Sequence, residues 1–204
     1  MALFVVVITG FALFTTILFY FVPANSVQSN SALFVKNTNT FPTQQETTPL
    51  ADNVTFGLPM RLKIPKIDVD STVEYVGLTS DGAMDVPKER ANVGWLNLGP
   101  RPGENGSAVI DGHYGGKAAV FDNLYKLRKG DKLYVEDNKG VTISFVVREN
   151  RRYNPKLIKT DATYIFGSTD GKSHLNLITC EGAWDDKAQQ YSERLVVFAD
   201  KETE

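Results

Sequence analysis

The chain has 204 residues, of which 42% are hydrophobic, and a formal net charge of −2 from 22 basic and 24 acidic residues. This length allows one domain with a full core plus an appendage, and it excludes two large domains. The charges of both signs are interspersed, so no strongly basic surface is available for a phosphate backbone and we expect no nucleic-acid partner.

Residues 1–22 are apolar and carry no charge. As a helix they would span roughly 33 Å, about the thickness of the hydrocarbon core of a bilayer. The alternative is a cleaved signal peptide, because Val22-Pro23-Ala24 resembles a small-residue cleavage site. The stretch is longer than a typical signal-peptide core and no basic residue precedes it, so we predict a retained transmembrane anchor.

Residues 23–58 are rich in Ser, Thr, Asn, Gln and Pro. Such a segment buries too little apolar surface to fold alone, and it is predicted to be a flexible linker with its ends about 30 to 36 Å apart. The linker would hold the domain at residues 59–204 near the membrane surface.

The domain shows repeated period-two patterns. In residues 141–148, Val141, Ile143, Phe145 and Val147 alternate with the other side chains, which is typical of a half-buried strand. Further strand-like runs, separated by turn sequences, occur at 60–64, 72–77, 107–110, 132–136, 174–179 and 195–199. The spacing predicts a mostly antiparallel sandwich or closed barrel, with minor helical pieces near 118–124 and within 155–166.

Sequence motifs for cofactors are missing from this chain. It has no Walker loop, no dinucleotide fingerprint and no internal repeat. Two histidines and one cysteine would need added carboxylates to build a zinc site. We therefore predict neither a cofactor nor a metal.

Cys180 is the only cysteine, so it cannot form an internal disulfide and must serve packing, intermolecular pairing or chemistry. An ordinary thiol is only about 3% ionised at pH 7, so a reactive cysteine usually needs a nearby cation or base. His174 is closest in sequence, but six steps along one strand would place it about 20 Å away. We interpret His174 as a polar residue at the mouth of the strand.

His113 and Arg194 are the better candidates to act with Cys180. His113 follows a strand-like run at a glycine-rich break. Arg194 begins the run that follows a predicted loop over 181–193 and returns antiparallel to the cysteine strand. Each has an ordinary interpretation: a lone loop histidine is more often at the surface or hydrogen-bonded, and the alternative for Arg194 is an exposed strand residue paired with Glu193 or Asp185. Together, the three predict a thiol, an imidazole and a guanidinium that converge.

At these residues the chain resembles a sortase, a membrane-anchored cysteine transpeptidase. The family's Thr-Leu-x-Thr-Cys motif is similar to Asn176-Leu177-Ile178-Thr179-Cys180, and its histidine motif is similar to Asp111-Gly112-His113. Its arginine lies on the next strand, as Arg194 does, and VFDNLYKLRKGDKLYVED resembles the family's approach to its middle strands. The resemblance covers residues 59–200. Asn176 departs from the motif, so the subclass stays open, with classes D, E and F as the expectation.

The resemblance implies an eight-stranded β-barrel in an extracytoplasmic, single-pass protein of a Gram-positive-type envelope. It implies that Cys180 cleaves a C-terminal sorting signal similar to Leu-Pro-x-Thr-Gly through a thioacyl intermediate, with His113 as acid and base and Arg194 as the oxyanion and substrate contact. Thr179 would shape the pocket, and the backbone amide of Glu181 would assist Arg194. The implied partners are surface proteins with sorting signals and an amine from a peptidoglycan precursor or a pilin lysine. Residues 155–173 would line the sorting-signal groove.

Two alternatives remain open from the sequence. A cysteine peptidase or amidase acting on cell-wall peptides would use the same residues, since it differs only in passing the acyl group to water. A non-catalytic, stalked adhesion domain would use Cys180 for packing alone.

Overall fold

The computed structural model describes residues 55–156, 161–168 and 170–203, all within the compact unit Leu50–Glu204. The predicted anchor at 1–22 and the linker over 23–54 lie outside the described residues. None of the helices in the described ranges has the length and hydropathy needed to cross a membrane. Residues 55–58 are bound to the domain, because the Gly57 amide donates to Asp137 Oδ2 at 2.6 Å.

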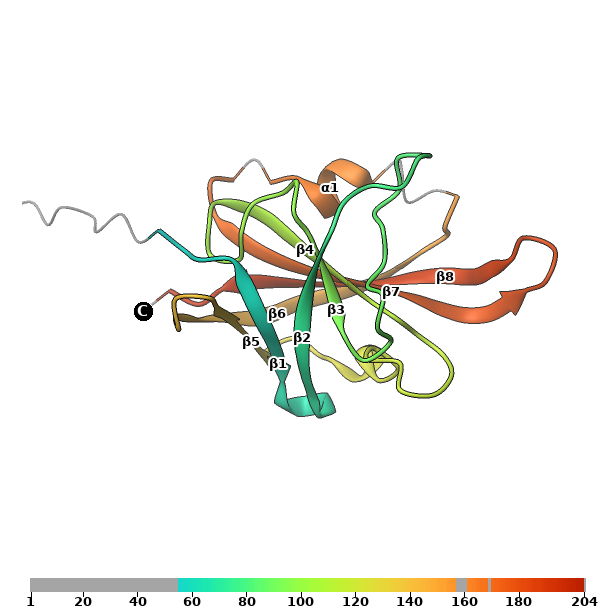
Figure 1. The fold of residues 1–204 in the computed structure, drawn as a ribbon, viewed down its shortest axis with the longest axis horizontal. Helices are drawn as coiled ribbons and strands as arrows, with labels where there is room; N and C mark the ends of the chain where they lie inside the picture. Colours follow the sequence, from blue (N-terminus) through green and yellow to red (C-terminus); the bar gives the residue numbers. More distant parts are fainter. Residues whose placement is uncertain (1–54, 157–160, 169, 204) are drawn as a thin grey trace, which may run out of the picture. The chain divides into compact units, whose positions relative to one another are not determined.

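In the described part of the chain, eight strands close into a barrel in the order β1-β2-β3-β4-β7-β8-β6-β5 (Figure 1). The strands are β1 (Pro59–Ile64), β2 (Val69–Val76), β3 (Val93–Leu96), β4 (Gly106–Gly112), β5 (Lys132–Asp137), β6 (Thr142–Tyr153), β7 (Ser173–Asp185) and β8 (Gln190–Lys201). The helical elements are the 3₁₀ turns η1 (Pro65–Ile67) and η2 (Leu124–Lys126) and the helix α1 (Ala162–Phe166). The predicted mostly-β barrel with short helices is confirmed.

Alternate residues of each strand fill the barrel interior. Leu175 and Leu177 of β7 and Leu195 and Val197 of β8 all belong to the main core cluster and are almost completely buried. Period-two alternation places these side chains on one face of the sheet, and the residues between them face outward. Burial of each such side chain contributes about 1.5 to 3 kcal/mol.

Two strand pairs are parallel, β2 with β3 and β4 with β7, within an otherwise antiparallel barrel. The strand β3 was not among the runs identified by alternation, because all four of its residues are buried and the pattern has no polar phase. The parallel pairing of β4 with β7 places the carboxyl end of β4 beside Ile178 in the middle of β7, which determines where Cys180 meets the segment after β4.

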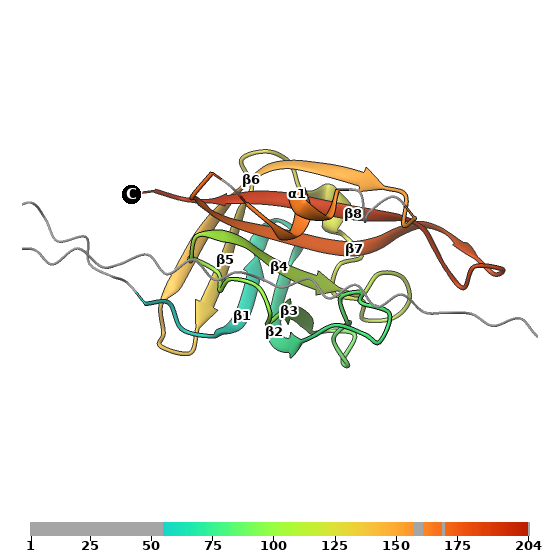
Figure 2. The same ribbon diagram turned by 90° about the horizontal axis from the view of Figure 1, so that it is seen from above.

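The strands β7 and β8 are longer than the sequence predicted. We expected a loop over 181–193, but β7 continues to Asp185 and β8 begins at Gln190, with a register shift between Glu181 and Trp184. The pair therefore extends beyond the barrel as a two-stranded ribbon (Figures 1 and 2). An edge-to-face contact between Trp184 and Tyr191, with ring centroids 5.2 Å apart, packs across this ribbon.

The helix α1 packs on the outside of the barrel. Its Ile165 is completely buried in a second apolar cluster with Val109 of β4, Ile178 of β7 and Val196 of β8. Asn176 Nδ2 donates to Ile165 O at 2.6 Å, and Ser107 Oγ donates to Gly167 O at 2.8 Å. The segment between β6 and β7 thus covers one end of the outer face of β4, β7 and β8. This matches the helical piece predicted within 155–166, whereas near 118–124 the observed turn is η2.

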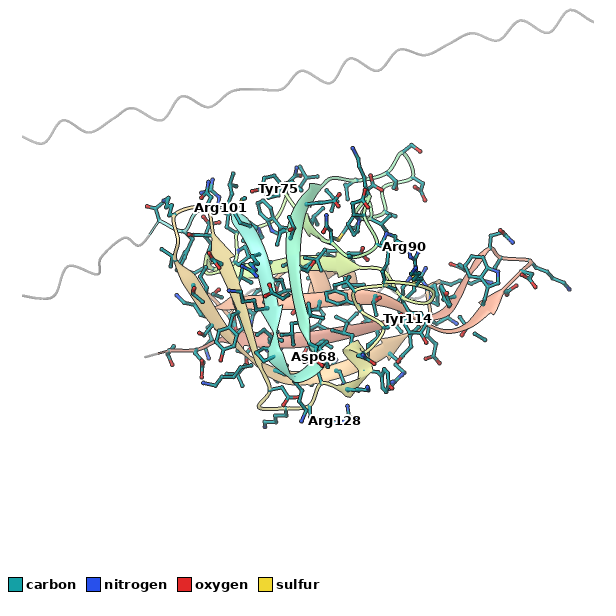
Figure 3. All side chains as sticks on the ribbon, turned by 60° about the horizontal axis from the view of Figure 1, so that its bottom comes forward. Asp68, Tyr75, Arg90, Arg101, Tyr114 and Arg128 are labelled. Atoms are coloured by element: carbon teal, nitrogen blue, oxygen red, sulfur yellow. The ribbon has the colours of Figure 1, made fainter. Side chains whose placement is uncertain are left out.

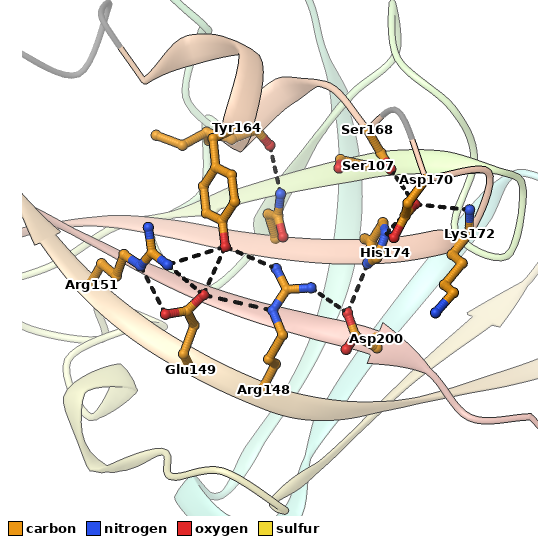
Figure 4. Close-up of polar contacts among 12 residues, drawn as sticks. Ser107, Arg148, Glu149, Arg151, Tyr164, Ser168, Asp170, Lys172, His174 and Asp200 are labelled. Atoms are coloured by element: carbon orange, nitrogen blue, oxygen red, sulfur yellow. Dashed lines mark hydrogen bonds and ion pairs between the residues drawn. The ribbon is translucent and has the colours of Figure 1, made fainter.

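A polar network fastens the segment between β6 and β7 to the barrel (Figure 4). His174 lies between two carboxylates, with Nδ1 2.8 Å from Asp200 and Nε2 3.0 Å from Asp170. Arg148 donates to the same Asp200 oxygen at 2.8 Å, and Tyr164 of α1 donates to Glu149 at 2.8 Å. The Ser168 hydroxyl, His174 and the Lys172 amide hold the pKa of Asp170 well below its usual range.

Leu177 tests the barrel core. Its side chain is 0% exposed in the main cluster, so Leu177→Ala should lower the free energy of unfolding by about 2 to 5 kcal/mol through lost burial and a new cavity. Leu98, which is 70% exposed, provides the matched control, and Leu98→Ala should leave stability nearly unchanged. Denaturant unfolding of the two variants measures the difference, and equal stabilities would contradict this assignment of the core.

Candidate active site

Cys180 and Arg194 are direct neighbours across two strands. In the antiparallel pairing of β7 with β8, Cys180 lies opposite Arg194 and Thr179 lies opposite Leu195. Leu195 and Leu177 face the core, so Cys180 and Arg194 share the outer face of the sheet. The strand register brings a thiol and a guanidinium together, as the sequence predicted.

His113 directly follows β4, at the edge where β4 ends beside β7. The backbone is held here by Thr179, whose buried hydroxyl donates to Gly112 O at 2.6 Å. Gly112 is needed because a Cβ at this position would lie only 2.4 Å from the buried ring of Phe121. His113 Nε2 lies 2.8 Å from Pro87 O. Since a carbonyl only accepts, Nε2 carries the hydrogen, and Nδ1 is the nitrogen of the neutral ring that can take up a proton.

The glycine-rich loop after His113 is fixed by Arg90 and Asp122. Arg90 donates to the carbonyls of Tyr114 and Gly115, and the Gly115 amide donates to Asp122 Oδ1 at 2.6 Å. Figure 3 shows Arg90 and Tyr114 on the side of the barrel from which the β7–β8 ribbon projects. Gly115 has a φ of +72°, and a Cβ there would lie 2.2 Å from the Tyr191 hydroxyl. A side chain at residue 115 would therefore push the loop away from the ribbon.

A pocket of about 680 Å³ joins the three predicted residues. Cys180, His113 and Arg194 all line it, and so does Asp111. Its remaining walls come from the segment before β3, the glycine-rich loop and the ribbon, namely Val86, Arg90, Gly112, Tyr114, Gly115, Gly116, Trp184, Gln189, Gln190 and Tyr191. The prediction that these side chains converge from separate segments therefore agrees with the structure.

Arg194 makes no ion pair with any described residue. Its Nη1 donates to the carbonyls of Tyr191 and Glu193, at 3.2 and 3.0 Å. Glu193, one of its possible partners from the sequence, lies 3.7 Å from Arg152 instead. Only Nη1 of the guanidinium is bound to these carbonyls, so Arg194 keeps its charge and its other N–H donors for a ligand.

The Cys180 thiol is partly buried, and burial raises its pKa above the ordinary value. Arg194 acts in the opposite direction, and Asp111 adds to the increase. Burial outweighs the guanidinium, so the resting thiol is protonated at neutral pH and must give its proton to a base when it reacts.

Asp111 is the residue that sequence reasoning missed. It lines the pocket, and its Oδ1 is buried without a hydrogen-bond partner among the described residues. Burial raises its pKa to about 7, while Arg194 lowers it and Asp85 raises it. The available signal was an acidic residue at the end of an apolar run, two positions before His113.

The two residues predicted to bind substrate, Thr179 and Glu181, have other contacts in the structure. The Thr179 side chain is buried inside the barrel and supports Gly112, so it reaches the pocket only through the backbone that precedes His113. The Glu181 carboxylate binds Arg152 at 2.6 Å. His174 lies on the same strand as Cys180 but near its other end, within the network around Asp170 and Asp200, as expected for a residue outside the site.

A thiol, an imidazole and a guanidinium around one pocket define a class of enzyme that forms covalent acyl intermediates on cysteine. Comparison with known proteins agrees with this class. The family model described as the sortase domain matches residues 62–202. The chain belongs to the sortase family, whose members are cysteine transpeptidases.

Solved sortase structures show the same fold. Sortase C-1 from Actinomyces oris has 26% identity and a TM-score of 0.54, covering 71% of this chain and 73% of that one. Sortase C from Clostridium perfringens SM101 has 24% identity and a TM-score of 0.52, covering 74% of each chain. A lid mutant of sortase A from Corynebacterium diphtheriae has 23% identity and a TM-score of 0.55, covering 76% and 75%. The comparison with curated proteins returned no match.

The thiol pKa can be tested by alkylation of the full chain with iodoacetamide as a function of pH, followed by mass spectrometry. The wild-type rate should rise with a midpoint above the usual thiol pKa of about 8.5. Arg194→Ala removes the charge that favours the thiolate, so the midpoint should move up. Asp111→Asn removes a charge that opposes the thiolate, so the midpoint should move down.

Each unit of pKa changes the rate at fixed pH by about tenfold below the midpoint. Glu136→Gln, a charge change on β5 at a side chain that pairs with Lys63, is the control and should leave the profile unchanged. A wild-type midpoint well below 8, or shifts of the opposite sign in the two variants, would contradict the electrostatic account.

Proposed function

We propose that this sortase cleaves a C-terminal sorting signal similar to Leu-Pro-x-Thr-Gly and transfers the protein to an amine of the cell wall or of a pilin. The observation that carries the proposal is that Cys180, His113 and Arg194 line one pocket at the rim of the barrel. The partners would be surface proteins that bear the signal and a peptidoglycan precursor or pilin lysine that supplies the amine.

The first step is acylation of Cys180. The thiol is protonated at rest, so it transfers its proton to Nδ1 of His113, whose Nε2 is already engaged by Pro87. The thiolate attacks the Thr-Gly carbonyl, and the negative charge moves to the carbonyl oxygen. Arg194, directly across from Cys180, supplies the positive charge for this oxyanion, with the Glu181 amide as a second donor. Protonated His113 then gives its proton to the leaving glycine amine, and a thioacyl enzyme remains.

The second step is transfer to the acceptor. An incoming primary amine loses a proton to neutral His113 as it attacks the thioester carbonyl. The second tetrahedral intermediate again places its charge near Arg194, and collapse releases the Cys180 thiolate, which regains the proton from His113. A new amide bond replaces the thioester, so no cofactor is required. If water attacks instead, the same residues perform hydrolysis.

The protein's location follows from the same proposal. Residues 1–22 would anchor the chain in the membrane as a single pass, and the linker would present the catalytic domain on the extracytoplasmic side. A sorting signal emerging from the membrane and a cell-wall amine would both be within reach of such a domain.

Variants of the three pocket residues test the proposal on the full chain with a Leu-Pro-x-Thr-Gly peptide and a glycine-based or lysine amine. Cys180→Ala should abolish turnover and the thioacyl adduct. His113→Ala and Arg194→Ala should each reduce kcat by roughly 100-fold or more, because proton transfer or oxyanion stabilisation is lost. Circular dichroism should show a retained fold in each case.

His174→Gln is the matched histidine control, because His174 lies outside the pocket. It should lower thermal stability by weakening the contacts to Asp170 and Asp200, yet keep kcat near the wild-type value. The reverse ranking of His113 and His174 would overturn the assignment. Cleavage without any amine-linked product at saturating amine would support a peptidase or amidase in place of a transpeptidase.

A further inference from the structure

The outer face of β4, β7 and β8 is covered by α1 over part of its length and is open near Cys180. Its apolar part consists of Val109, Ile178 and Val196, which belong to the cluster under α1. At one end, Ser107 and Asn176 are hydrogen-bonded to the segment that contains α1. At the other end, the face opens into the pocket with Cys180 and Arg194.

Asp111 lies on the same outer face and lines the pocket with Cys180. On β4 it follows Val109 by two residues and therefore faces the same side of the sheet. In the parallel pairing with β7 it lies opposite Ile178, two residues before Cys180. Residues two apart on a strand are about 6 to 7 Å apart, so the Asp111 side chain is about two substrate residues away from the position of the scissile bond.

The Asp111 carboxyl has unmet hydrogen-bonding capacity. Its Oδ1 is buried and has no partner among the described residues. A buried acceptor without a donor costs free energy, and a ligand that brings a donor recovers that cost. The charged groups that affect it come from different segments: Arg194 from β8, Cys180 from β7 and Asp85 from the segment before β3. Arg194 remains bound to backbone carbonyls and does not satisfy Asp111.

The position of His113 indicates which part of the substrate meets Asp111. His113 follows β4 beyond Asp111 and would protonate the leaving amine, so the leaving group and the acceptor belong on the side of His113 and the glycine-rich loop. The acyl part of the substrate must then extend in the other direction, past Asp111, which lines the pocket. A side chain of the sorting signal just before the scissile bond would contact the carboxyl.

We propose that Asp111 is a specificity-determining residue that selects a sorting signal with an N–H-bearing side chain among the residues preceding the scissile bond. Lys and Arg are the preferred side chains, and Gln and Asn come second. The inference rests on the proposed function, and it specifies the substrate class. A site with a buried hydrogen-bonding group discriminates strongly against a substrate that lacks the group needed to form that hydrogen bond. The backbone amides of a peptide cannot provide this selection, because every sorting signal has them.

The test is a positional peptide library in which each of the three residues before the scissile Thr-Gly bond is varied, with kcat/KM measured for the full chain. At one of these positions, the wild type should prefer Lys over norleucine and Gln over Met by roughly tenfold or more. Asp111→Ala should reduce both ratios to near one while the aliphatic peptides are still cleaved. Asp111→Asn, which keeps the shape and an acceptor oxygen, should lose the preference for Lys and keep part of that for Gln.

Glu193→Gln is the matched control. Glu193 is an acidic residue next to Arg194, and its own carboxylate faces Arg152. The Glu193→Gln variant should rank the peptides as the wild type does. An unchanged ranking in Asp111→Ala, or an equal loss for all peptides, would overturn the inference and leave the transpeptidase proposal intact. If the wild type forms no thioacyl enzyme with any peptide, the proposed function fails, and the inference fails with it. Thermal melting identifies a variant that has not folded, and the isosteric Asp111→Asn then decides the result.

Discussion

The register between β7 and β8 is the constraint on which the rest of the site depends. It places Cys180 directly opposite Arg194 and points both side chains away from the core. A shift of β7 by one residue would turn Cys180 into the barrel and bring Leu177 and Thr179 to the outer face, while Arg194 stayed outside. The buried residues on either side, Leu177 and Leu195 among them, make such a shift very costly.

The parallel pairing of β4 with β7 brings His113, the third pocket residue, to this pair. It brings Gly112 close enough to accept the hydrogen bond from Thr179, and His113 follows at once. The Pro87 carbonyl then fixes the ring so that Nδ1 is the exchangeable position of the neutral imidazole. A buried thiol that is protonated at rest needs such a base, and it is less exposed to unwanted oxidation or alkylation than a thiolate would be.

The barrel could be predicted because strand alternation is a local pattern, and the convergence of Cys180, His113 and Arg194 could be predicted because each lies at one end of such a run. Alternation identified the first part of β6 and the first part of β7, and strand geometry separated His174 from Cys180. Alternation did not identify the strand β3, because its four residues are all buried. The ribbon beyond Cys180 was predicted as a loop, because its exposed residues, including Gly182 and Asp185, are typical of turns. Asp111 was not predicted as a site residue. The burial of its Oδ1 without a donor, and its closeness to Arg194, arise only from the pairing of distant strands. Tyr114, Trp184 and Tyr191 join the pocket for the same reason, through ring contacts between the loop after β4 and the ribbon.

The central claim is that Cys180 carries the acyl group of a sorting signal and passes it to an amine. Intact-mass spectrometry of the full chain, mixed with a Leu-Pro-x-Thr-Gly peptide and quenched in acid, measures this directly. The account predicts a mass increase equal to the acyl fragment, located on Cys180, that disappears when a glycine-based or lysine amine is added and reappears as the amine-linked peptide. Peptide cleavage by the Cys180→Ala variant, or by the wild type with no adduct on Cys180, would contradict it.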